Sequence, residues 1–90
     1  MTTPRKIRRS IVSLHKFADK LCTLLNVVPP LEVRFSSMSV PDMLKQVDNL
    51  LREIQGDLLP AILDKGDIKV FRALSEEWNN VLENVRILLG

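Results

Sequence analysis

The stretch PRKIRRSIVSLHKFADKLCTLLN, residues Pro4–Asn26, carries the strongest helical pattern in this chain. Its apolar residues recur at spacings of three and four throughout, which places them on one side of a helix. They are Ile7, Ile11, Leu14, Ala18, Leu21 and Leu25, and Val28 continues the series. Pro4 suits the first turn of a helix, and Pro29-Pro30 cannot continue one. The stretch therefore predicts a long amphipathic helix whose apolar stripe must be buried.

Two further amphipathic helices are predicted downstream. The first begins at Ser39, which can cap it, with Pro41 and Asp42 in the first turn, and it runs to about Gln55. Its apolar residues share an arc of ~120°, and they are Val40, Met43, Leu44, Val47, Leu50, Leu51 and Ile54. The second is predicted over 68–89, after Asp67. Its stripe consists of Phe71, Leu74, Trp78, Val81, Val85 and Leu88.

The segments between these helices complete the predicted architecture. Gly56 and Asp57 are expected to interrupt the second helix, with Asp57 capping a short, buried third helix that Gly66 closes. Residues 31–38 alternate apolar and polar side chains, which predicts an extended connection packed on the helices. The less favoured alternative is a strand that pairs with another copy of the chain. The sequence thus predicts one all-α domain over residues 1–90, a four-helix bundle-like array of two long helices, one medium and one short.

Composition suggests more apolar surface than one small core can hide. Of the 90 residues, 46% are hydrophobic, whereas a domain this small buries only about 60–65% of its unfolded surface. We therefore expect self-association, as a dimer or higher oligomer, or a protein partner that covers the surplus. The alternative is a leucine-rich bundle whose single core accommodates all of these side chains.

Cysteine content and hydropathy bear on the compartment. The single cysteine, Cys22, cannot form an internal disulfide and favours a reducing, intracellular and cytoplasmic location. No apolar run approaches the ~20 residues of a transmembrane helix. The basic, acid-free stretch 1–18 also has the composition of a mitochondrial presequence, but its long apolar stripe favours a packed helix.

Catalysis and cofactor binding are not expected. The chain has one histidine, one cysteine and no glycine-rich loop, so it lacks the convergent polar groups of an enzyme. His15, Asp19 and Cys22 share one side of the first helix and could supply three zinc ligands. The preferred interpretation is a histidine paired with Asp19, with Cys22 as a small buried side chain. No cofactor or metal is therefore predicted.

A basic ridge is the strongest polar feature. Four cations lie directly opposite the apolar stripe of the first helix: Arg5, Arg9, Lys16 and Lys20. Lys6 and Arg8 flank them, and Lys6 is counted with the four as a possible anion contact. Such a ridge could bind phosphates of nucleic acid, lipid headgroups or an acidic protein surface. It lacks interleaved aromatic residues, so a solvated helix face is the preferred interpretation and nucleic acid is not favoured.

Two more apolar features have the character of possible binding sites. The residues 21–25, LCTLL, match the L-x-x-L-L pattern of helical docking peptides, although the same spacing defines a buried helix face. The single Trp78 is expected in the core rather than at a ligand site.

The function that follows is a non-enzymatic interaction module. It would act as an adaptor or oligomerisation unit through apolar and charged helix faces. The apolar residues expected to face a partner lie outside the main stripes: Val12, Phe17, Leu24, Ile87 and Leu89. The alternative is a small nucleic-acid-associated protein that uses the basic first helix.

Overall fold

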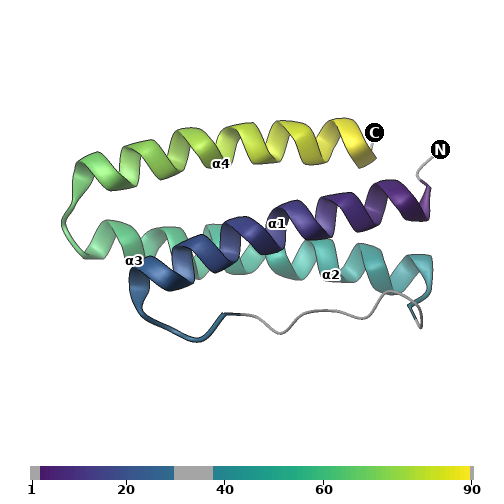
Figure 1. Cartoon of the computed structure of the whole chain (residues 1–90), viewed down its shortest axis with the longest axis horizontal. Coiled ribbons are helices and arrows are strands. Elements are labelled where there is room, and N and C mark those ends of the chain that lie inside the picture. The colour runs from purple at the N-terminus through teal and green to yellow at the C-terminus, as the bar shows by residue number, and fades with distance from the viewer. Residues whose placement is uncertain (1–2, 30–37, 90) are drawn as a thin grey trace.

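A computed structural model of the chain describes residues 3–29 and 38–89. These residues form α1 (Pro4–Leu25), α2 (Val40–Glu53), a π-helical turn η2 (Ile54–Leu58), α3 (Leu59–Asp64) and α4 (Ile68–Leu89). The all-α prediction is confirmed. The predicted count of four helices is wrong, because α2, η2 and α3 follow one another without a break and form one rod, which leaves three rods (Figure 1). Most of the predicted extended connection lies outside the described residues.

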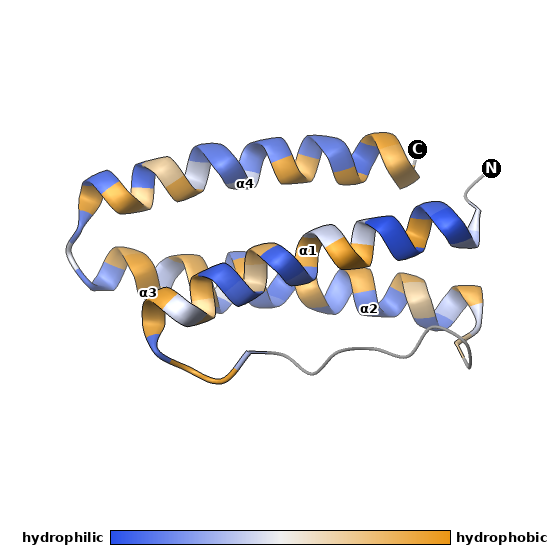
Figure 2. Ribbon diagram, in the orientation of Figure 1, coloured by the Kyte–Doolittle hydropathy of each residue, from blue (hydrophilic) through white to orange (hydrophobic). Residues whose placement is uncertain are grey.

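The three rods lie side by side, with α1 as the shared partner. Figure 1 shows α1 and α2 running in the same direction and α4 returning in the opposite one. Helix α1 packs along both α2 and α4, and α4 also packs on α3, whereas α2 and α4 make little direct contact in the described part of the chain. Figure 2 shows the apolar residues gathered on the sides of the helices that face one another.

Three of the predicted helix ends are formed, at Ser39, Gly66 and Asp67. Ser39 caps α2 by accepting a hydrogen bond from the backbone N–H of Asp42 at 3.3 Å, and Asp67 accepts one from the N–H of Val70 at 3.2 Å. Gly66 adopts a left-handed conformation with φ of 85° after α3. Asn26, with φ of 58°, ends α1 in the same way, since its short polar side chain tolerates this conformation.

The expected break at Gly56 and Asp57 is absent, and the π turn explains why. The buried residues of this rod recur at spacings of four, at Ile54, Leu58 and Ile62. On an ideal α-helix each such step rotates the side chain by ~40° relative to the one before. The N–H of Leu59 donates to the carbonyl of Ile54, five residues back, so the turn is wider and takes up this rotation. Leu58 and Ile62 thereby stay buried in the core. Asp57 makes no cap, because the helix has no free end there.

Two glycines in this rod should respond oppositely to alanine. Gly56 lies in the right-handed π turn, and a Cβ added there meets nothing within 4 Å. Gly56→Ala should therefore raise the free energy of unfolding by about 0.4–1 kcal/mol. Gly66→Ala should lower it by about 1 kcal/mol or more, because L-residues resist positive φ. Urea unfolding would measure both, and effects of the same sign would contradict the assignment of the turn.

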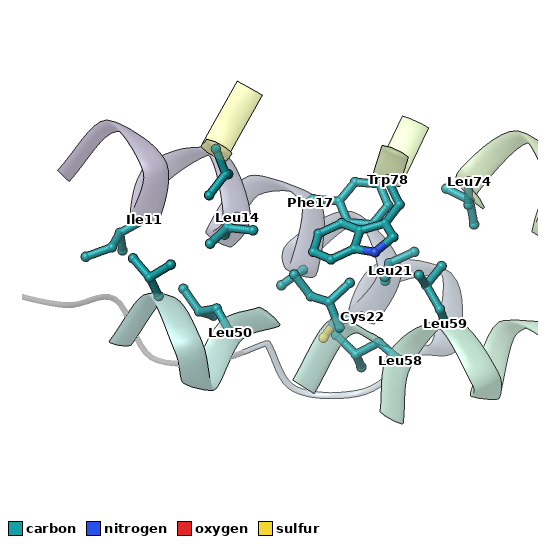
Figure 3. Packing of buried hydrophobic residues seen from close by; sticks show 14 of the residues in the cluster. Ile11, Leu14, Phe17, Leu21, Cys22, Leu50, Leu58, Leu59, Leu74 and Trp78 are labelled. Atoms are coloured by element: carbon teal, nitrogen blue, oxygen red, sulfur yellow. The ribbon is translucent and has the colours of Figure 1, made fainter. Parts of the chain in front are cut away.

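The core lies along α1. Ile7, Leu14 and Leu21 are fully buried on this helix. Phe17 of α1 stacks on Trp78 of α4, with ring centroids 5.3 Å apart and planes at 26°. In Figure 3 the two rings lie over one another, with Leu21 beside them. The predicted burial of Trp78 is confirmed, at 4% exposure. This aromatic pair joins α1 to α4 by apolar contact.

Candidate functional site

An apolar groove lies between α2 and α4, and we call it the α2–α4 groove. It exists because both helices pack on α1 and little on each other. Four apolar side chains and two polar ones line it: Leu51, Leu82, Val85 and Leu89, with Gln55 and Arg86. Gln55 belongs to the π turn, so the wider turn forms part of one wall. A groove of this composition can accept an apolar helix face.

The apolar character of the groove continues along α2. On the helical repeat, Val40 and Leu44 lie on the same side of α2 as Leu51. Their side chains are 36% and 43% exposed. The sequence assigned all three residues to one buried stripe. Only Met43, Val47, Leu50 and Ile54 are buried, because α1 covers one side of that wide stripe and leaves its edge uncovered.

Charges of both signs flank the groove. Arg86 of α4 lines it, and no ion pair of this residue is found within residues 3–29 and 38–89. Asp48 of α2 lies one turn from Leu51, and its Oδ2 is 3.2 Å from Nε of Arg52. Both side chains of that pair are exposed, so the ion pair contributes little to stability. Asp48 is therefore available to another cation.

The five apolar residues predicted to face a partner differ in their exposure to solvent. Val12, Leu24 and Ile87 are exposed, at 43%, 45% and 66%, but none of them lines the α2–α4 groove. Leu89 is half-buried and lines the α2–α4 groove. The prediction for Phe17 is wrong: it is 3% exposed because it stacks on Trp78.

Sequence reasoning missed Leu82 and Arg86 as groove residues. Leu82 lies beside the main stripe of α4, next to Val81 and Val85, and it is half-buried. Its position at the edge of that stripe is a signal from which its place in the groove could have been predicted. Leu51 offered the same signal on α2. Which edge stays uncovered depends on how the rods pack, and the sequence does not reveal that.

The basic residues of α1 form the second candidate surface. A shallow depression on this helix is lined by Arg5, Arg8, Arg9 and Lys16 around Val12 and Ser13. Within residues 3–29 and 38–89, no carboxylate lines it. Lys6 is exposed but is not part of the lining. The positive charge on this face can attract phosphates or carboxylates.

Lys20 differs from the rest of the predicted ridge. Its Nζ lies 2.7 Å from Oε2 of Glu77, so the two side chains bridge α1 and α4. Half of each side chain is exposed to solvent, so the pair is screened. An external anion would have to compete with Glu77 for Lys20. The depression therefore presents its charge through the arginines and Lys16.

His15, Asp19 and Cys22 adopt the structural arrangement preferred from sequence. Nδ1 of His15 lies 3.8 Å from Oδ1 of Asp19, and Cys22 is buried. Burial raises the pKa of the Cys22 thiol, and Glu53 and Asp19 raise it further. The thiol therefore stays protonated near neutral pH, and a protonated thiol is a poor ligand and nucleophile. The described segments hold no group of three His, Cys, Asp or Glu side chains placed to bind a metal ion.

The L-x-x-L-L pattern does not form a free docking motif. Leu21 is completely buried and Leu25 is half-buried, whereas Leu24 is exposed. The first leucine of the pattern belongs to the core, so a partner could reach it only if α1 left the bundle.

Comparison with protein-family models, with curated proteins and with solved structures gives no significant match to this chain. None of the helices in the described ranges is long and apolar enough for a membrane span.

Proposed function

We propose that this chain is a non-enzymatic protein-interaction module that docks a helical partner in the α2–α4 groove. The observation that supports this proposal is the groove itself: Leu51, Leu82 and Leu89 line an open channel between two helices. A third helix laid there would bury these side chains, as amphipathic helices do in other grooves. Intracellular adaptor or oligomerisation roles are consistent with such a surface.

Neighbouring residues on α4 provide a direct test of the groove. At high dilution, the protein should bind an environment-sensitive apolar dye, because apolar clefts exclude water around the dye. Leu89→Gln should reduce the fluorescence enhancement severalfold, since Leu89 lines the groove. Ile87→Gln is the matched control, because Ile87 is exposed outside the groove. Equal loss in both variants, or no dye binding by the folded protein, would count against the proposal.

Nucleic-acid association is the second candidate function. The observation that favours it is the depression on α1, which is lined by Arg5, Arg8, Arg9 and Lys16. Four phosphate contacts could form there without involving Lys20. The described residues that line the depression include no aromatic side chain on which a base could stack, so binding there would depend on the backbone of the nucleic acid.

The salt dependence of duplex DNA binding tests this second candidate. Four phosphate contacts predict a log–log slope of affinity against salt of roughly −3.6. Arg9→Ala should make the slope shallower by about one unit and weaken all sequences alike. Lys69→Ala, an exposed cation on α4, serves as the control. An affinity for DNA that does not depend on salt concentration would exclude phosphate binding at this depression. Equal effects of Lys69→Ala and Arg9→Ala on that affinity would exclude it as well.

A further inference from the structure

We propose that the occupant of the α2–α4 groove is the same face of a second copy of this chain, with the two copies related by a two-fold axis parallel to the helices. In this dimer Arg86 of each copy lies against Asp48 of the partner subunit. The inference rests on the proposed function, because it names the partner of the same groove. It is argued from the apolar lining, the directions of the helices and the charges.

The two walls of the groove complement each other in direction. Helices α2 and α4 run in opposite directions within one copy (Figure 1). A two-fold axis parallel to them places α2 of each copy over α4 of the other and leaves each helix pointing the same way along the axis. The two α2 and two α4 helices then form a four-helix bundle in which every neighbouring pair is antiparallel, as in up-down-up-down bundles. The apolar side chains on the α2 and α4 walls of both grooves become buried at the centre of that bundle.

The same symmetry brings the two charges to one level. Rotation about an axis parallel to the helices does not change a residue's position along that axis. Leu51 of α2 and Arg86 and Leu89 of α4 line the same groove, so they share a level. Asp48 precedes Leu51 by three residues, about 4.5 Å along the helix, towards the end of the groove where Leu89 lies. Asp48 of one copy therefore faces the Arg86–Leu89 turn of the other.

Charge complementarity favours a second copy over an unrelated helix. The face carries a cation on its α4 wall and a carboxylate on its α2 wall, so it is complementary to itself after the two-fold rotation. Arg86 makes no ion pair in the described ranges. The exposed Asp48–Arg52 pair is weak enough to exchange. An isologous interface of this kind closes at the dimer, because each face is used once.

Sedimentation equilibrium of the full chain across a concentration series tests the dimer. We expect a monomer–dimer equilibrium. Arg86→Glu should weaken it by at least about tenfold, because it opposes like charges at two symmetric sites. The double variant Arg86→Glu/Asp48→Arg should restore the affinity to within about threefold, because the pair is re-formed with its charges exchanged. Lys69→Glu, which reverses an exposed cation outside the groove, should leave the equilibrium unchanged.

Leu89→Gln gives a second, uncharged test of the same interface. It should weaken the dimer, while Ile87→Gln should not, and far-UV circular dichroism would verify that both variants remain folded. A dimer that is indifferent to Arg86→Glu, or that the double variant fails to restore, would overturn the proposed geometry. A monomer at every concentration would overturn the dimer itself. If that monomer still binds the apolar dye, and Leu89→Gln abolishes the binding, the groove remains a docking site for a different protein. If the monomer binds no dye, the proposed function fails as well.

Discussion

Trp78→Ala should lower the free energy of unfolding by about 3–5 kcal/mol, the usual cost of deleting a large buried aromatic side chain. Trp78 is 4% exposed and stacks on Phe17, so the substitution removes apolar burial and leaves a cavity between α1 and α4. A small domain has only about 5–15 kcal/mol of stability, so the variant should be severely destabilised. Urea unfolding followed by far-UV circular dichroism measures the change, since the only tryptophan is lost.

Ile87→Ala on the same helix is the control for this measurement. Ile87 is 66% exposed, and its truncation should change stability by less than about 0.5 kcal/mol. A loss below about 1 kcal/mol for Trp78→Ala would instead mean that Trp78 is exposed in solution. In that event the stack between α1 and α4 would not be part of the folded state.

Leu21→Ala and Leu24→Ala form a matched pair on α1. The same side chain is deleted twice, but Leu21 is fully buried and Leu24 is 45% exposed. Leu21→Ala should lower the free energy of unfolding by about 2–5 kcal/mol, from lost burial and the cavity left in the core. Leu24→Ala should cost less than about 1 kcal/mol, since much of its side chain is already solvated. Both values come from urea unfolding monitored by tryptophan fluorescence or circular dichroism.

Similar losses for the two leucines would contradict the position of α1 between the other rods. The alternative in which 21–25 act as a mobile docking peptide predicts that result, because α1 would then leave the core readily. A large loss of unfolding free energy for Leu21→Ala, without a similar loss for Leu24→Ala, would exclude that alternative.

Local patterns were sufficient to predict the amphipathic helices and most of their ends. The three-and-four spacing of α1 requires one buried side, whatever covers it. Ser39, Asp67 and Gly66 act within one turn of their own positions, so their roles follow from side-chain and backbone chemistry. The expected break at Gly56 failed for a different reason. A glycine followed by an aspartate commonly ends a helix, but here burial of Leu58 and Ile62 keeps the chain helical through a π turn.

The candidate surfaces were only partly predictable. The basic face of α1 is visible in the sequence because its charges lie within one helix, although the sequence did not show that Lys20 pairs with Glu77 of α4. Phe17 lies at the edge of its stripe, and only the position of Trp78 decides that it is buried.

The amino-acid sequence thus determines the all-α class, the helix ends at Ser39, Gly66 and Asp67, and the amphipathic stripes, because each depends on residues within a few turns of one another. Tertiary structure decides that three rods form instead of four helices, and that α1 packs on both of the others. The α2–α4 groove exists for that second reason: Leu51, Leu82 and Leu89 are apolar residues at the edges of two stripes. Whether such an edge is covered depends on the relative positions of distant helices, which no local pattern encodes.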